Sequence, residues 1–118
     1  MEKILVYSTW GPTDPTRAGL AFTFAKVAKK EGSDVVIFLF HDAVSLARQE
    51  MVEHIVPIGP PLLKDSIKFL LSESVKIYVC KPCFELRGMD EVELIQDAEL
   101  KGMDMFFELS KDRKLVTF

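Results

Sequence analysis

The sequence has no excess of positive charge and no long hydrophobic run, and each shortage excludes a class of protein. Fifteen basic side chains against 18 acidic ones leave a formal net charge of −3, whereas nucleic-acid binding favours a basic face. The longest apolar run, Val35–Phe40, is far too short to span a bilayer. The first residues lack the basic segment and the long apolar stretch of a signal peptide. We therefore expect a cytoplasmic protein that binds neither nucleic acid nor membranes.

Cysteine is equally scarce, because Cys80 and Cys83 are the only two in the chain. They are too few for a disulfide framework, and cytoplasmic thiols are normally reduced. The 118 residues, 48% of them hydrophobic, suffice for one domain with its own core. We therefore expect residues 1–118 to form a single domain with two reduced thiols.

Strand and helix patterns alternate along the chain. Asp14 followed by Pro15 predicts a helix start, because Asp accepts from free backbone N–H groups and Pro needs no partner at the first helical position. Gly32 is typical of a residue just past a helix end. The expected strands cover residues 1–9, 35–40, 75–79 and 114–118, with helices over 15–31, 41–51, 61–72 and 103–111, a short helix near Pro82, and a short helix and a short strand within 88–100.

The repeated strand–helix order predicts a three-layer α/β/α domain, flavodoxin-like or Rossmann-like, with a mainly parallel sheet of about five strands. In such a sheet, functional groups gather at the carboxyl ends of the strands. Polar or aromatic residues follow each of the first strands or stand close to the cysteines. The candidate pocket residues are Thr9, Trp10, Arg17, His41 and Arg87.

The segment Tyr78–Gly88 carries both cysteines. Cys80 ends the third expected strand, and Pro82 predicts that a helix begins directly after it. A helix N-terminus favours an anion, so we expect the pKa of Cys80 to be lowered and its thiolate to be the reactive form. Cys83 lies about one turn further on and can act as a resolving, auxiliary or structural residue. The segment therefore predicts a nucleophilic Cys80 with Cys83 beside it.

Three other chemistries fit this pattern less well. A thioredoxin-type site also uses strand, C-x-x-C and helix, but here the motif follows the third strand and no proline follows Pro82. The four His and Cys residues lack the compact spacing of a zinc site. No G-K-[ST] motif accompanies Gly11 or Gly19, so a nucleotide site is not expected. We expect neither a metal nor a cofactor.

The whole pattern resembles the DsrE/DsrF-like family of small sulfur-relay proteins, which includes Tus-type and YchN-like members. The segments DPTRA, VVIFLFHDAV, IGPPLLKDSIKFLL and KLVTF stand where the family's elements stand. The most specific feature is a cysteine at the end of the third strand with a glycine eight residues later, here Cys80 and Gly88, preceded by Arg87. The family commonly has a small residue at the position of Cys83, so the second cysteine departs from its pattern.

The resemblance implies a function as well as a fold. Active members accept sulfane sulfur as a persulfide on the strand-end cysteine, which is Cys80 here, and pass it from a donor protein to an acceptor protein. It also implies homotrimers or hexamers with the cysteine near a subunit boundary. We therefore predict a sulfur carrier or sulfurtransferase. Two alternatives remain: a non-catalytic oligomeric binding or assembly subunit, and a dithiol oxidoreductase that uses Cys80 and Cys83.

Overall fold

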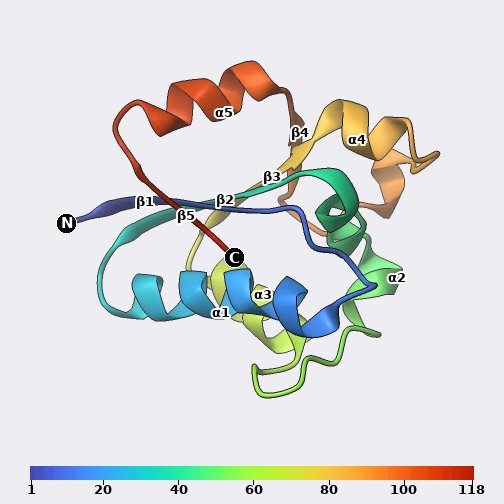
Figure 1. Cartoon of the computed structure of the whole chain (residues 1–118), viewed down its shortest axis with the longest axis horizontal. Coiled ribbons are helices and arrows are strands. Elements are labelled where there is room, and N and C mark those ends of the chain that lie inside the picture. The colour runs from blue at the N-terminus through green and yellow to red at the C-terminus, as the bar shows by residue number, and fades with distance from the viewer.

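Five parallel strands form the centre of the protein. The structure, a computed structural model, describes residues 1–118. The strands lie in the order β4-β3-β2-β1-β5, and every neighbouring pair is parallel (Figure 1). This confirms the predicted fold class, with its mainly parallel sheet of five strands. The strand bounds are β1 Lys3–Ser8, β2 Asp34–Leu39, β3 Lys76–Cys80, β4 Glu99–Lys101 and β5 Lys114–Thr117.

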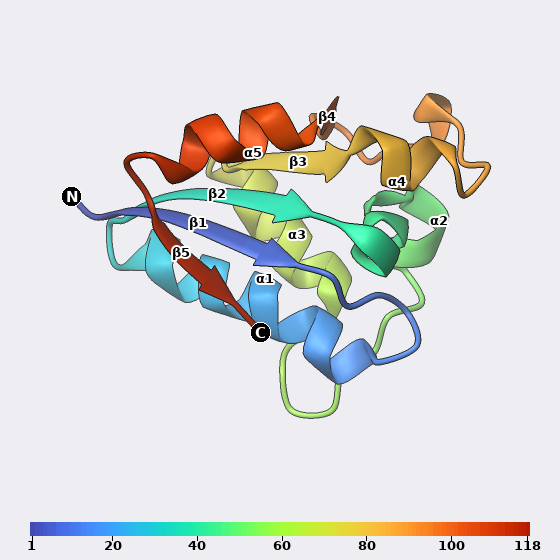
Figure 2. The same cartoon turned by 45° about the horizontal axis from the view of Figure 1, so that its top comes forward.

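Helices cover both faces of the sheet and thereby give the three predicted layers. The helices α1 (Pro15–Lys30) and α3 (Leu63–Ser72) pack on one face, and α5 (Met103–Ser110) lies on the other (Figures 1 and 2). None of the helices is both long enough and apolar enough to cross a membrane. The remaining short elements gather near the carboxyl ends of β2 and β3 (Figure 2): η1 His41–Ala47, α2 Gln49–Val52, α4 Lys81–Glu85 and η2 Glu91–Glu93.

The start of α1 follows the expected rule. The Asp14 side chain accepts a hydrogen bond from the backbone N–H of Arg17 at 3.1 Å, and Pro15 is the first helical residue. Gly32 adopts φ +93° just past the helix end, a conformation that glycine tolerates best. The predicted cap and stop of this helix are therefore confirmed.

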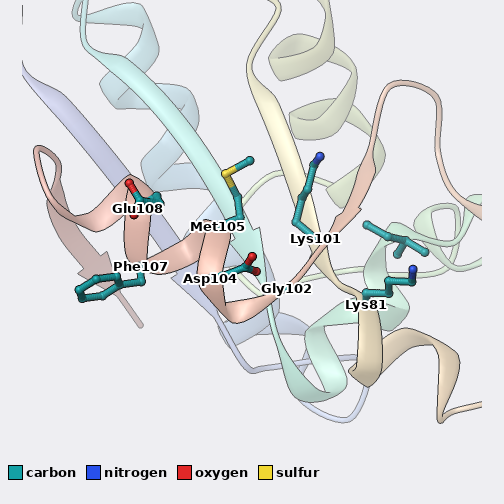
Figure 3. Close-up of a pocket in the computed structure, with 8 residues that line it drawn as sticks. Lys81, Lys101, Gly102, Asp104, Met105, Phe107 and Glu108 are labelled. Atoms are coloured by element: carbon teal, nitrogen blue, oxygen red, sulfur yellow. The ribbon is translucent and has the colours of Figure 1, made fainter.

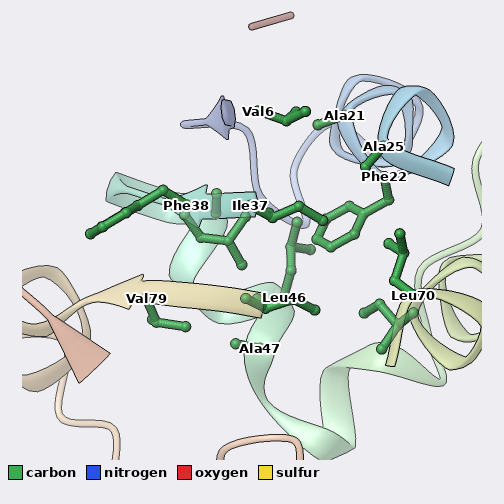
Figure 4. Close-up of a cluster of buried hydrophobic side chains, with 14 of the residues drawn as sticks. Val6, Ala21, Phe22, Ala25, Ile37, Phe38, Leu46, Ala47, Leu70 and Val79 are labelled. Atoms are coloured by element: carbon green, nitrogen blue, oxygen red, sulfur yellow. The ribbon is translucent and has the colours of Figure 1, made fainter. Parts of the chain in front are cut away.

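The main core lies between the sheet and the α1–α3 layer. Phe22 of α1, Ile37 of β2 and Leu70 of α3 lie together there (Figure 4) and are almost completely buried. Burying a side chain of this size contributes about 1.5–3 kcal/mol to folding. These contacts pack α1 and α3 against β2, which pairs with β3 along the sheet, and both strands lead into the site at their carboxyl ends.

An aromatic cluster occupies the opposite face of the sheet. The ring of Phe106, on α5, makes edge contacts with Tyr7, Phe38 and Phe40, at centroid distances of 5.3, 5.4 and 5.0 Å. Phe38 also stacks on Phe40 at 4.7 Å. Edge-to-face pairs of this kind add to the energy of simple burial. The cluster is therefore the main attachment of α5 to the sheet.

The helix predicted over residues 41–51 is present, but as two short pieces and not as one continuous helix. The chain forms the 3₁₀ helix η1 over His41–Ala47 and then the short α2. Between them, Arg48 is extended and makes an isolated antiparallel bridge with Leu94. A 3₁₀ helix repeats every three residues, and the buried residues of η1 follow that repeat: Ala43 with Leu46, and Val44 with Ala47.

Candidate functional site

Both cysteines lie where β3 ends and α4 begins. Cys80 is the last residue of β3 and stands at the N-cap position of α4, which has Pro82 in its first turn. The helix predicted near Pro82 is therefore confirmed. Cys83 lies within the same five-residue helix, and neither cysteine is in a disulfide. The β3–α4 junction thus places two thiols within a single helical turn.

The expected lowering of the Cys80 pKa is wrong. Cys80 is only 6% exposed, and burial, together with a side-chain hydrogen bond to Cys83 and repulsion by the charge on Cys83, raises its pKa from 9.0 to about 11. A backbone hydrogen bond from Cys83 and the charge of Arg87 lower the pKa of Cys80, but their combined effect is smaller than the increase. A helix of five residues has only a weak dipole, whereas removal from water strongly disfavours the thiolate. Cys80 is therefore a protonated thiol at neutral pH.

Cys83 has a different environment, because it is partly exposed and its sulfur meets a backbone amide. The N–H of His41 donates to Cys83 Sγ at 3.3 Å. His41 adopts φ +53°, a left-handed conformation that is uncommon for residues other than glycine and is often found at functional sites. This turn at the end of β2 directs the His41 amide toward Cys83 Sγ on α4, the helix that follows the neighbouring strand β3.

Arg87 connects α4 to η1. Its guanidinium donates to the Cys83 carbonyl oxygen at 3.0 Å and to Asp42 Oδ1 at 3.1 Å, and it meets His41 Nδ1 at 2.8 Å. Arginine carries only donors, so Nδ1 must be the acceptor and the ring proton of His41 lies on Nε2. Arg87 therefore fixes Cys83, His41 and Asp42 relative to one another.

The structure brings together two of the five predicted pocket residues, His41 and Arg87. Trp10 and Arg17 instead pair with each other, with the guanidinium 4.4 Å from the ring centroid, and no hydrogen bond or ion pair joins either to the cysteines. Thr9 is exposed in the same loop and likewise lacks such a contact. A role for Thr9, Trp10 and Arg17 in the pocket stays a prediction.

Sequence reasoning missed two residues that shape the site. Asp42 was not among the candidate pocket residues, yet it binds Arg87. Gly11 packs so closely on η1 that a Cβ there would lie 2.3 Å from the Asp42 carbonyl oxygen. The one available signal for Asp42 was its place next to His41 at a strand end, while nothing in the sequence marked the close approach of Gly11.

An open pocket of about 540 Å³ lies beside the cysteines, between the start of α4, β4 and α5 (Figure 3). Lys81 and Lys101 line its β3–β4 end, while Asp104 and Glu108 come from α5. Lys101 is also the direct partner of Cys80 in the β3–β4 register. Neither cysteine lines this pocket, so it adjoins the dithiol and does not enclose it. No group of three or more His, Cys, Asp or Glu residues is arranged to hold a metal ion.

Replacing Arg87 with Met tests its connecting role. The change keeps a long apolar stem but removes all donors, so we expect His41 to lose its fixed tautomer and Cys83 to become more mobile. Because Arg87 is partly exposed, the free energy of unfolding should fall by only about 1 kcal/mol. NMR of the His41 ring nitrogens measures the tautomer. Lys81→Met is the matched control, and a His41 spectrum unchanged in Arg87→Met would contradict the assignment.

The DsrE/DsrF-like family model matches residues 2–118 of the chain. The uncharacterized protein MJ0989 of Methanocaldococcus jannaschii is 38% identical over 117 residues, which cover 98% of this chain and 99% of that protein. MK0008 of Methanopyrus kandleri is 30% identical and is matched over 94% of its length. MJ0760 of M. jannaschii is 33% identical over 112 residues, but this chain spans only 41% of its length.

Two solved structures share the fold at low sequence identity. The YchN protein of E. coli superposes with a TM-score of 0.84 at 21% identity, with both chains covered completely. MTH1491 of Methanobacterium thermoautotrophicum, a protein of unknown function, gives 0.77 at 12% identity, again with complete coverage of both chains. At these identities the likeness concerns the arrangement of strands and helices.

Proposed function

Since this chain belongs to the DsrE/DsrF-like family, whose members are related to sulfur relay, we propose that it is a cytoplasmic sulfur carrier. It accepts sulfane sulfur from a donor protein as a persulfide on Cys80 and passes that sulfur to an acceptor protein. The observation that carries the proposal is a pair of free, interacting thiols at the carboxyl edge of the sheet. Proteins with parallel α/β folds commonly bind their ligands and carry out their reactions at that edge.

The transfer needs no oxidant. A donor persulfide gives its outer sulfur to the carrier and leaves as a thiol, so one S–S bond forms as another breaks. The Cys80 thiol becomes a persulfide, whose terminal sulfur extends one atom beyond the buried Sγ. A persulfide is more acidic than a thiol, so the loaded group ionises where the empty thiol does not. The raised pKa of empty Cys80 therefore protects the unloaded carrier from unwanted alkylation and oxidation.

A second candidate, a dithiol oxidoreductase, is favoured by the presence of two free thiols within one turn of α4. Such a protein cycles between two thiols and a disulfide with a defined potential. It should reduce the disulfides of insulin in the presence of a dithiol reductant. Sulfur loading without insulin reduction favours the carrier over the oxidoreductase.

We also propose that the protein assembles with itself as a trimer or hexamer. Large apolar side chains are exposed on α5 and β5, among them Met103 at 63%, Phe107 at 62% and Leu115 at 47%. Large apolar side chains exposed to solvent are available to an interaction surface. Sedimentation of the purified chain measures its state, and a monomer at all concentrations would contradict this part of the proposal.

The carrier function is tested by mass spectrometry after incubation with glutathione persulfide. The wild-type protein should gain the mass of one sulfur atom, and peptide mapping after blocking should place that atom on Cys80. The double variant Cys80→Ser/Cys83→Ser is the control and should gain nothing. A wild-type protein that gains no sulfur, or that keeps it only on Cys83, refutes the proposal.

A further inference from the structure

We infer that sulfur enters this protein through Cys83, which takes it from the donor and hands it inward to Cys80. The inference rests on the proposed carrier function and adds an order of events to it. Cys83 becomes the residue that meets the donor, and Cys80 becomes the residue that stores the sulfur.

Accessibility separates the two thiols. Cys80 is only 6% exposed, which restricts the approach of a donor persulfide to its sulfur. Cys83 is partly exposed on α4. A thiolate that attacks a donor persulfide must reach the outer sulfur directly, because the reaction passes through one line of three sulfur atoms. Of the two cysteines, Cys83 is the one that a donor can reach.

A backbone hydrogen bond also favours Cys83 as the thiol that reacts first. The His41 N–H, aimed by its left-handed backbone, donates to Cys83 Sγ at 3.3 Å. A backbone donor stabilises a sulfur that carries negative charge. Burial is the largest cause that raises the pKa of Cys80, whereas Cys83 is partly exposed, so we assign the first attack to Cys83. Arg87 holds the Cys83 carbonyl and the His41 ring, and so keeps amide and sulfur aligned.

The inward step balances within the pair. Cys80 Sγ attacks the outer sulfur of the Cys83 persulfide, and a new S–S bond forms on Cys80 as the Cys83 S–S bond breaks. The bonding electrons move to Cys83 Sγ, which lies in the same helical turn of α4. The proton of Cys80 passes to Cys83 Sγ, so the charge balances as well. Cys83 ends as a thiol facing the His41 amide, and nothing is oxidised or reduced overall.

Loading rates with glutathione persulfide test this order. Cys83→Ser should load Cys80 about tenfold more slowly than wild type at neutral pH, because the reachable thiolate is gone. Direct loading of Cys80 predicts the opposite. Without Cys83, its hydrogen bond and its charge no longer raise the pKa of Cys80, so Cys80 should react as fast as in wild type, or faster.

Cys80→Ser supplies the complementary test. It should take up one sulfur at the wild-type rate and hold it on Cys83, where peptide mapping can find it. Cys80→Ala repeats the measurement with a residue that makes no hydrogen bonds, and circular dichroism checks that each variant is folded. Lys68→Ser, on the exposed face of α3, is the control and should load normally.

The outcomes separate this inference from the carrier function. If the wild-type protein takes up no sulfur, the carrier proposal itself fails. If the wild type loads but Cys83→Ser loads just as fast, only the entry role of Cys83 fails. Release of hydrosulfide with formation of a Cys80–Cys83 disulfide would also overturn the inward transfer, because Cys80 would then have attacked the inner sulfur.

Discussion

Alkylation of the native protein with iodoacetamide at neutral pH is expected to modify Cys83 and to spare Cys80. Burial and the neighbouring Cys83 raise the pKa of Cys80 from 9.0 to about 11. Two pKa units reduce the thiolate fraction about 100-fold, and only the thiolate reacts. Limited access to the buried sulfur lowers the rate further. Peptide mapping over a time course measures both residues in one sample.

The pH dependence follows from the direction of this shift. A raised pKa means that the Cys80 thiolate appears only as the pH climbs, so its alkylation rate should increase about tenfold per unit between about pH 8 and 10. In urea, where burial is lost, the two cysteines should react at similar rates, which provides the control. Equal labelling of Cys80 and Cys83 in the folded protein at pH 7 would contradict the structure of the site.

Replacing Phe106 with Ala is expected to detach α5 from the sheet. Its ring makes edge contacts with Tyr7, Phe38 and Phe40, whereas Met105 and Leu109, the other residues of α5 that pack on the core, are only partly buried, as Phe106 is. Loss of these contacts should lower the free energy of unfolding by about 2–4 kcal/mol. Urea unfolding measures that loss, and hydrogen exchange should show weakened protection of residues 103–110.

The neighbouring residue provides a matched control for this change. Phe107 lies on the same helix but is 62% exposed, with the Lys111 ammonium 5.3 Å from its ring centroid. Phe107→Ala should change the stability by no more than about 0.5 kcal/mol. If both substitutions had the same effect, helix propensity would explain it, and the aromatic cluster would not be the attachment of α5.

Much of the fold can be predicted from the sequence because its signals are local and agree with one another. Asp14 and Pro15 mark a helix start, and the continuous apolar run Val35–Phe40 is typical of a strand covered on both faces. The strand that ends at Cys80 and the helix after it can be predicted from the sequence equally well. Even residues 88–100, with weak patterns, contain the expected short helix and short strand, as η2 and β4.

The chemistry of the site could be predicted only in part, because it depends on contacts between distant segments. A helix start after Cys80 suggests a lowered pKa, but the surrounding packing removes the sulfur from water and reverses the shift. Likewise, Arg87 meets His41 and Asp42 only because β2 and β3 are neighbours in the sheet. The pattern over residues 41–51 did not reveal that the helix begins in the 3₁₀ form and is interrupted at Arg48.

The two cysteines and the amide that serves Cys83 belong to different parts of the chain. The separation of the sulfurs is set inside one turn of α4, whereas His41 arrives from the end of β2. Mutations in η1 can therefore change the hydrogen bond from the His41 amide to Cys83 Sγ while the spacing of the two cysteines stays constant. Because the two features change independently, a few substitutions in η1 could convert a sulfur carrier into a disulfide-forming protein without a change of fold.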